Sequence, residues 1–159
     1  MGFFEWIGCL LILWVGAAVG VLLVRFERRR CRQAEGFVAL VRYIRLQIDC
    51  FSMPVGRILR GCDGKLLIDC GVESDCLTDF CGLLQKTRLY LPEEMCRLLW
   101  DFGRRLGESY RADQLRNCDY FLERLTPCCD RLRTELPKRE RMMLLLPMAF
   151  AAMLVLLLV

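Results

Sequence analysis

The chain contains two long stretches in which no charged residue interrupts the apolar ones. The first runs from Trp6 to Val24 and the second from Met142 to Val159. Each is close to the roughly 20 residues that a helix needs to cross the hydrocarbon core of a bilayer. We therefore predict a transmembrane helix over residues 1–24 and a transmembrane or membrane-inserted helix over residues 142–159. Pro147 leaves open whether the second helix crosses fully.

The first apolar stretch differs from a secretory signal peptide in its flanking charge. Signal peptides begin with positive residues, whereas Glu5 is the only charged residue before this stretch and basic residues follow it. We therefore expect an uncleaved anchor. Within it, Gly16 and Gly20 form a small-xxx-small pattern that lets another helix approach closely. Ala149 and Ala152 lie on one side of the second stretch, so we expect the two stretches to pack together.

Between these stretches, apolar residues recur at helical spacing, which predicts an all-α bundle over residues 25–141. One helix is expected over residues 33–51, continuous with the N-terminal anchor, and a short one begins at Pro54. Another is expected over residues 73–86, whereas the strand-like run from Leu66 to Gly71 is too short to found a sheet. The residues expected on the buried faces are Phe37, Leu40, Val41, Ile44, Ile48 and Phe51, then Val55, Ile58, Leu59 and Cys62, then Cys76, Leu77, Phe80, Leu83 and Leu84.

Two further helices are predicted, joined at Gly107-Glu108-Ser109. The first begins at Pro92, because a proline followed by two glutamates is typical of a helix start. Gly107 is expected to end it, and Ser109 is a suitable cap for the next helix. Gly103 is unfavourable in the middle of a helix, so we expect a close helix contact there. The predicted buried face consists of Met95, Leu98, Leu99, Phe102 and Leu106.

The last of these helices carries an unbroken seam of apolar residues at alternating intervals of three and four. A heptad seam needs a partner surface, either in the same chain or in a second copy. Pro127, the short length and the paired helix before it favour packing within the chain. We expect a kink at Pro127 and the end of the helix at Pro137. The seam consists of Leu115, Cys118, Leu122, Leu125, Cys129, Leu132 and Leu136.

The net charge of +4 is concentrated beside the two apolar stretches. Residues 33–137 hold 15 basic and 16 acidic residues, so the bundle lacks the basic face that binds nucleic acid. Positive charge next to a membrane helix marks the cytoplasmic side and attracts anionic lipid. We therefore expect a cytoplasmic bundle with membrane lipid as a partner. The predicted membrane-surface residues are Arg25, Arg28, Arg29, Arg30, Arg32, Lys138, Arg139 and Arg141.

The chain has eleven cysteines and no histidine. In the reducing cytoplasm we expect these cysteines to be buried apolar residues, and their spacing lacks a zinc-ligand pattern. Without a histidine, paired carboxylates or a serine beside a base, we expect no catalytic residue, cofactor, metal or enzyme activity. The cysteine content keeps open the alternative of a thiol- or metal-sensing membrane protein. A generic membrane-anchored helical scaffold is another alternative.

The turn between the last two helices resembles a known family. The sequence Leu99-Trp-Asp-Phe-Gly-Arg-Arg-Leu-Gly-Glu-Ser-Tyr110, followed by Asp113 and Gln114, is similar to stage III sporulation protein AB. That family combines a leucine, a Phe-Gly pair, a Leu-Gly pair, a serine or aspartate cap and a glutamine. It also has an N-terminal membrane helix, a helical domain and a leucine-rich C-terminal membrane segment. This chain departs from the family in its cysteine content and in residues 61–71.

The resemblance implies a component of a secretion-like channel complex in the mother-cell membrane around the forespore. It implies contact with the companion ATPase, stage III sporulation protein AA, and with other proteins of that complex. It also implies a cytoplasmic domain similar to the inner-membrane platform protein of type II secretion and type IV pilus systems. The residues predicted to contact a partner are Phe102, Gly103, Leu106, Gly107, Tyr110 and Gln114.

Overall fold

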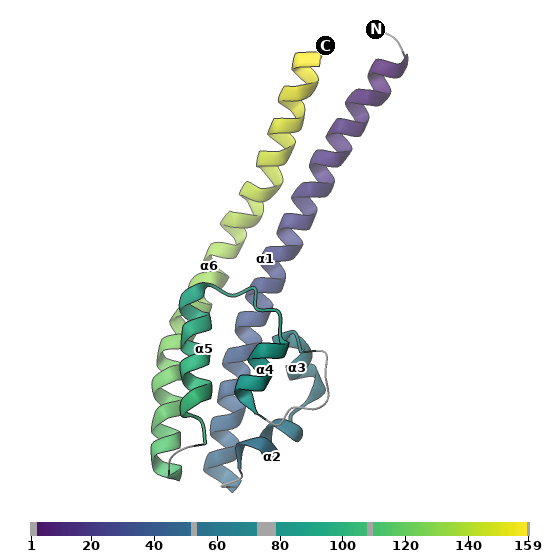
Figure 1. Ribbon diagram of the computed structural model, residues 1–159. Helices are drawn as coiled ribbons and strands as arrows, with labels where there is room; N and C mark the ends of the chain where they lie inside the picture. The colour runs from purple at the N-terminus through teal and green to yellow at the C-terminus, as the bar shows by residue number, and fades with distance from the viewer. Residues whose placement is uncertain (1–2, 52–53, 73–78, 108–109, 159) are drawn as a thin grey trace. The chain divides into compact units, whose positions relative to one another are not determined.

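In the computed structural model the described elements are α-helices, as the apolar spacing predicts (Figure 1). The structure describes residues 3–51, 54–72, 79–107 and 110–158, and within these ranges it contains no strand. The helices in chain order are α1 (Phe3–Phe51), α2 (Val55–Arg60), α3 (Gly64–Cys70), α4 (Phe80–Lys86), α5 (Glu93–Arg105) and α6 (Arg111–Leu158).

The chain divides into two compact units. Unit 1 comprises residues 1–29 and 133–159, and unit 2 comprises residues 30–132. The long helices α1 and α6 each contribute one part to unit 1 and another part to unit 2. Unit 1 therefore holds both apolar stretches, whereas unit 2 holds all the short helices.

The helix α1 is continuous through the first apolar stretch and the basic residues that follow it. This confirms that the helix predicted over residues 33–51 continues from the N-terminal stretch. Its buried face agrees with the prediction except at Phe51, which is exposed because it is the last residue of the helix. The predicted residues of this face that are buried are Phe37, Leu40, Val41, Ile44 and Ile48.

The expectation of a strand-like run from Leu66 to Gly71 is wrong, because this segment forms α3. The Asp63 side chain caps the start of α3 by accepting a hydrogen bond from the Lys65 backbone N–H at 3.1 Å. Gly71 follows the end of α3 in the left-handed conformation, with a φ of 86°. The spacing of this short apolar run fits a helix or a strand. A side-chain cap at its start and a glycine at its end favour the helix.

The helix α4 corresponds to the last part of the helix predicted over residues 73–86. Residues 73–78, with the predicted Cys76 and Leu77, lie outside the described part of the chain. The other predicted residues of α4 and the centre of α2 are buried: Phe80, Leu83 and Leu84, and Ile58 and Leu59. Val55 and Cys62 are half-buried and pack against the same core.

The helix α5 begins one residue later than predicted, with Pro92 as its N-cap and two glutamates in its first turn. It ends where predicted, because Gly107 adopts a left-handed φ of 96°, which glycine takes without strain. Ser109, the predicted cap of the next helix, lies outside the described residues. On the predicted face, the enclosed residues are Met95, Leu99 and Phe102, and the half-buried ones are Leu98 and Leu106.

The helix α6 continues through Pro127, Pro137 and Pro147. The expected end at Pro137 is therefore wrong. A proline removes a single backbone hydrogen bond from a helix, and the residues on both sides of Pro137 keep helical register. An ion pair between Glu135 and Arg139, at 2.8 Å, spans this proline at the spacing of one helical turn.

The apolar seam of α6 packs on the core of unit 2, so the chain itself supplies a partner surface for the seam. Phe121 takes the enclosed position that the heptad assigns to Leu122. The reason is that a straight helix has 3.6 residues per turn and drifts from a strict heptad. The enclosed residues are Cys118, Phe121, Leu125 and Cys129, and the half-buried ones are Leu115, Leu122 and Leu132.

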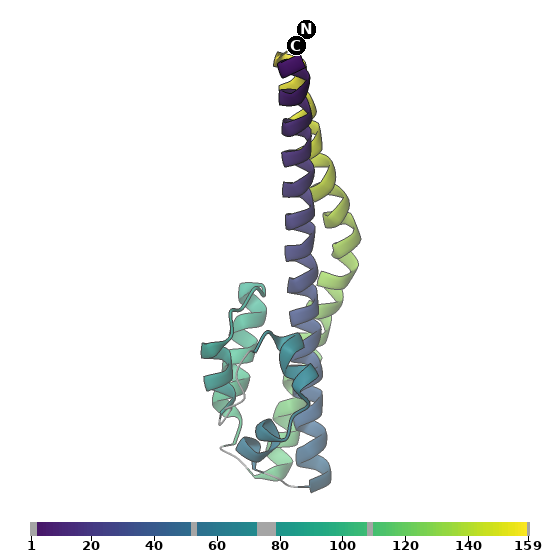
Figure 2. The same ribbon diagram turned by 90° about the vertical axis from the view of Figure 1, so that its right-hand side faces the viewer.

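In unit 2, the second part of α1 and the first part of α6 lie side by side (Figure 1). Figure 2 shows the short helices on one side of this pair. Two ion pairs join the long helices: Arg45 with Asp119, and Arg111 with Asp49. The turn between α5 and α6 therefore begins a helix that is attached directly to α1.

Candidate membrane and partner interfaces

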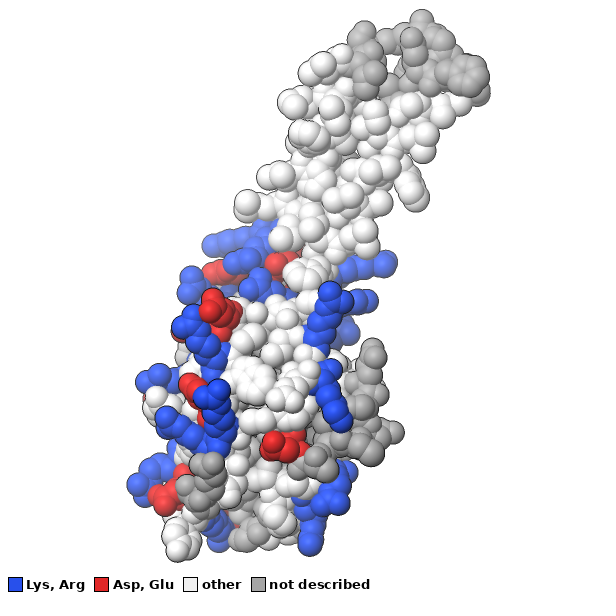
Figure 3. Space-filling view, viewed as in Figure 1, with Lys and Arg blue, Asp and Glu red and all other residues white. Residues whose placement is uncertain are grey.

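The two apolar stretches of unit 1 expose large apolar side chains along most of their length. Trp14 is 73% exposed and Leu156 is 80% exposed. Both helices that carry these stretches are long and apolar enough to cross a membrane. Figure 3 shows no charged side chain on the visible face of these stretches where the structure describes them. Because water solvates such a surface poorly, the surface fits the interior of a bilayer.

Gly16 and Gly20 bring the two apolar stretches into contact within unit 1. A Cβ atom added at Gly16 would lie 2.8 Å from the Ala151 Cβ, and one at Gly20 would lie 3.2 Å from a backbone oxygen of α6. This confirms the packing that the small-xxx-small pattern predicts. The alanine on the other helix differs from the prediction, because Ala151 is buried in the contact whereas Ala149 and Ala152 are exposed.

Ion pairs connect α1 to α6 next to the apolar stretches of unit 1. Arg28 Nε donates to Glu140 Oε1 at 2.6 Å, and this hydrogen bond holds the pKa of the Glu140 carboxyl below its usual value. Arg139 donates to Glu135 at 2.8 Å and lies 3.9 Å from the buried Glu27. Some of the basic residues at this junction therefore join the two helices to each other.

The eight basic residues predicted to meet the membrane surface differ in exposure. Arg28 and Arg139 take part in the ion pairs between the helices, and Arg30 is half-buried. The others are exposed: Arg25, Arg29, Arg32, Lys138 and Arg141. These five side chains are the ones available to an anionic surface, and their contact with lipid stays a prediction.

The six residues predicted to contact a partner lie at the end of α5, in the turn that follows and at the start of α6. Gly107 and Tyr110 are exposed, and Leu106 and Gln114 are half-buried. Phe102 and Gly103 are buried. Tyr110 is 88% exposed. Four of the six residues therefore reach solvent, and the other two are buried in α5.

Phe102 and Gly103 pack α5 against its neighbours. The Phe102 ring meets the rings of Phe80 and Phe121 edge-on, with centroids 5.1 and 5.5 Å away. A Cβ atom at Gly103 would lie 2.9 Å from Phe80 Cδ1 and from the Cys81 sulfur. This confirms the close helix contact that Gly103 predicts. The two buried members of the set thus position the turn through the core.

Ion pairs hold the start of α6 against α1. Arg111 donates to the backbone oxygen of Asp49 and lies 3.3 Å from its carboxylate. Arg45 donates to Asp119, and this hydrogen bond lowers the pKa of the Asp119 carboxyl. Tyr110 therefore projects from a turn that is held on one side by the core and on the other by α1.

The nine cysteines whose side chains the structure describes carry free thiols. Burial raises the pKa of the Cys118 thiol to about 11, and burial also raises the pKa of the Cys70 thiol. A thiol with a raised pKa stays protonated and unreactive near neutral pH. Within the described ranges, no group of three or more Cys, Asp or Glu side chains is placed to hold a metal ion. Cys76 lies outside these ranges.

Gln33 and Gly36 on α1 are two important packing residues that the sequence analysis does not identify. Gln33 is buried and bonds to backbone groups of two other segments. A Cβ atom at Gly36 would lie 2.8 Å from the backbone carbonyl carbon of Asp69, so α3 approaches α1 closely there. Both residues share a helix face with Phe37 and Leu40. A polar residue or a glycine on an otherwise apolar helix face is the sequence feature that indicates such a packing role.

Comparison with known protein families gives a match to the second part of the chain. Residues 82–159 match the family model of stage III sporulation protein AB. The match includes the turn sequence from Leu99 to Gln114 and the second apolar stretch, and it supports the resemblance seen in the sequence. Residues 1–81 lie outside it. Neither the curated proteins nor the solved structures give a significant match to this chain.

Proposed function

We propose that this chain is a stage III sporulation protein AB, a non-enzymatic, membrane-anchored component of a secretion-like complex formed during sporulation. The match of residues 82–159 to that family carries the proposal. The Phe-Gly and Leu-Gly pairs of the family motif lie at the end of α5 and in the following turn. The proposed likeness of the helical domain to the platform protein of type II secretion rests on the sequence resemblance alone.

The proposed location is the mother-cell membrane around the forespore, with residues 25–141 in the cytoplasm. Two exposed apolar helices support membrane anchoring, and the packing of Gly16 against Ala151 supports their insertion as a pair. The basic residues beside both stretches favour the cytoplasmic orientation, because cytoplasmic segments are enriched in Lys and Arg. The proposed location around the forespore rests on the resemblance to the family alone.

The proposed partner of the helical domain is the companion ATPase, stage III sporulation protein AA. Tyr110 is the best candidate for the contact because it is almost fully exposed, and Gly107, which precedes it in the sequence, is also exposed. The core holds this turn through Phe102, and Arg111 attaches it to α1. The helices α1 and α6 both continue into the apolar stretches, so a protein bound at the turn is coupled to the membrane helices.

Deletion of the gene in its sporulating host tests the proposed function. We expect the count of heat-resistant spores to fall by several orders of magnitude while vegetative growth is unchanged. The full-length chain supplied in trans should restore the spores, and a chain without residues 1–24 should not restore them. Normal spore counts in the deletion strain would contradict the proposal.

A further inference from the structure

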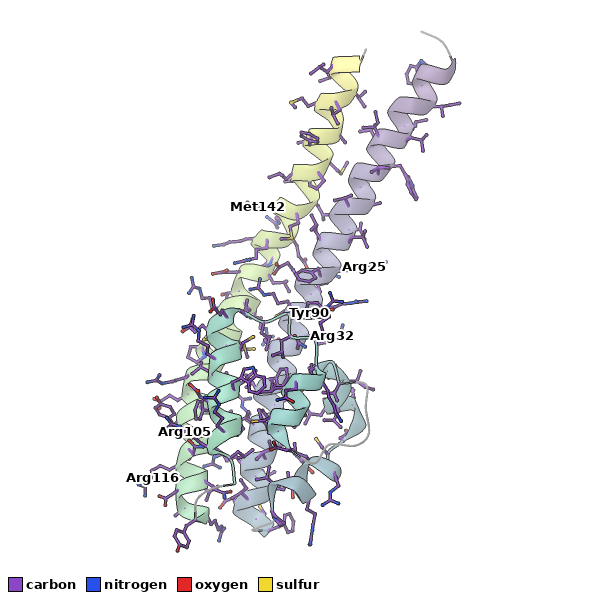
Figure 4. The ribbon with its side chains drawn as sticks, viewed as in Figure 1. Arg25, Arg32, Tyr90, Arg105, Arg116 and Met142 are labelled. Carbon is purple, nitrogen blue, oxygen red and sulfur yellow. The ribbon has the colours of Figure 1, made fainter. Side chains whose placement is uncertain are left out.

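A hollow lies beside the contact between the two apolar stretches of unit 1. Its volume is about 440 Å³, which is within the range of ligand sites in proteins. Its walls come from residues 11–19 of α1 and residues 147–154 of α6, and none of the side chains that line it is polar. Figure 4 shows these parts of the two helices side by side, above Arg25 and Met142.

The hollow is open toward the surroundings of unit 1. Side chains on its rim are exposed, among them Leu11, Val15, Val19 and Phe150. The rim therefore continues into the apolar surface that fits the interior of a bilayer. Because the bilayer core holds no water that could fill the hollow, a hydrocarbon group is the occupant whose chemistry matches its walls.

The residues around the hollow favour a lipid chain over a third helix. Helices approach one another closely in membranes where small residues meet. The small residues Gly16 and Ala151 line the hollow but already contact each other, since a Cβ atom added at Gly16 would lie 2.8 Å from the Ala151 Cβ. The larger Leu11, Val19 and Phe150 border the rest of the space. A narrow, flexible hydrocarbon chain therefore fits it better than a helix does.

Arg29 lies on the same side of α1 as the hollow. Leu11 and Arg29 are 18 residues apart on a continuous helix, which is five full turns. Arg29 follows Val24, the last residue of the apolar stretch, by about 7.5 Å along the helix. The headgroup layer of a bilayer extends roughly 5–8 Å beyond the hydrocarbon core, so Arg29 is at the depth of the headgroups.

The charge at this end of unit 1 is positive. Residues 24–29 and 133–143 hold seven basic and three acidic residues. Each of the three acidic residues lies within 3.9 Å of Arg28 or Arg139. Arg29 is exposed, and among the ion pairs of the described residues none involves it. An acidic headgroup therefore gains attraction at Arg29 without displacing an ion pair.

We propose that unit 1 binds one acidic phospholipid, with an acyl chain in the hollow and the headgroup at Arg29. The proposal deepens the proposed function, because it rests on the insertion of both apolar stretches into a membrane. A row of basic residues attracts lipid by charge alone, whereas this site also gives the lipid chain a fixed place. Both parts of the site lie within unit 1.

Native mass spectrometry of the purified full-length chain in detergent tests the chain site, with phosphatidylglycerol as the acidic lipid and phosphatidylcholine as the neutral one. Val19→Phe adds a ring to the hollow and should weaken the binding of both lipids at least about fivefold, because overfilling a packed site is unfavourable. Its matched control is Val21→Phe, since Val21 is 43% exposed against 44% for Val19 and does not line the hollow. The control should bind both lipids within about twofold of the unmodified chain.

Arg29→Gln tests the headgroup site separately. It should weaken the binding of phosphatidylglycerol about fivefold and leave that of phosphatidylcholine unchanged, because only the acidic headgroup loses a charge partner. The control Arg141→Gln removes an exposed arginine at the same end of unit 1, about 120° around α6 from Pro147. An equal loss of phosphatidylglycerol binding in both arginine variants would overturn the assignment of the headgroup to Arg29.

Photolabelling of the unmodified chain adds a measurement that needs no substitution. A phosphatidylglycerol with a diazirine in its acyl chain should label residues 11–19 and 147–154 ahead of the other apolar residues, and tandem mass spectrometry locates the label. Even labelling along both apolar stretches would overturn the proposal. Equal weakening in Val19→Phe and Val21→Phe, or no weakening in Val19→Phe, would overturn it as well.

A protein occupant of the hollow gives a different result. If Val19→Phe keeps its lipid binding but no longer recovers the other membrane proteins of the sporulation complex, the hollow is a site for a partner helix and the proposal is wrong. If the deletion strain forms normal numbers of spores while the purified chain binds phosphatidylglycerol at Val19 and Arg29, the proposed function fails and the lipid site stands.

Discussion

Gln33 makes three hydrogen bonds to backbone groups that are distant from it in the sequence. Its amide donates to the oxygens of Cys70 and Arg88, and its side-chain oxygen accepts from the Tyr90 N–H. The bond to Cys70 is buried and the bonds to Arg88 and Tyr90 are partly buried. Without Gln33, water could replace only some of these hydrogen bonds. One side chain thus attaches two segments to α1.

Replacing Gln33 with leucine should lower the free energy of unfolding by about 1–3 kcal/mol, because leucine has a similar volume but leaves buried polar groups unpaired. Urea unfolding of the full chain in detergent, followed by circular dichroism, measures the change. Gln85→Leu on the exposed side of α4 is the control and should change stability by less than about 0.5 kcal/mol. A loss no larger than the control would show that the three bonds contribute little.

The buried Cys118 thiol should make stability depend on alkaline pH. Burial raises its pKa from the usual 9.0 to about 11, so the folded state favours the protonated thiol. Its contribution is fully present below pH 9 and is lost as the pH rises toward 11, because the unfolded chain releases the proton first. Over this range the free energy of unfolding should fall more steeply in the unmodified chain than in Cys118→Ala. Equal slopes would contradict this assignment.

The packing of some residues can be predicted from the sequence pattern, and the packing of others cannot. The burial of Ile44 and Leu99 follows from helical spacing alone. The role of Gln33 does not, because its partners lie between 37 and 57 residues away along the chain. Gly36 is missed for the same reason, since the backbone it approaches belongs to α3.

At the scale of elements, long periodic helices were predictable and short segments were not. The apolar positions of α1 and α5 repeat over several turns, and their buried faces agree with the prediction except near the helix ends. The run from Leu66 to Gly71 has too few residues to distinguish the two periods, and its helical state depends on the cap at Asp63. The helix end predicted at Pro137 does not occur, because proline disfavours a helix without always ending it.

The continuity of α6 through Pro127 leads to a prediction about that proline. Pro127 is exposed, and alanine at this position restores an N–H that can bond to the carbonyl one turn earlier. Pro127→Ala should therefore raise the free energy of unfolding, by at most about 3 kcal/mol. Thermal melting of the full chain in detergent tests this. A lower melting temperature would mean that the fold depends on a bend that this proline produces.

For the whole molecule, the sequence indicated the two apolar stretches, the charge beside them and the all-α bundle. It did not indicate which residues of the turn reach solvent, because this depends on how α5 packs on α4. Phe102 and Gly103 match the family motif yet are buried, whereas Tyr110 is exposed. A motif residue that packs and one that binds a partner look alike in a single sequence.

The role proposed for this chain is to hold the sporulation ATPase at the membrane through the exposed turn at Tyr110. The most direct measurement is the fraction of that ATPase that sediments with membranes from sporulating cells. We expect the ATPase to move to the soluble fraction in the deletion strain and in Tyr110→Glu, and to stay with the membranes in the control Arg116→Glu, which changes an exposed residue of the same helix. If the ATPase remains with the membranes when this chain is absent, the proposed role is wrong.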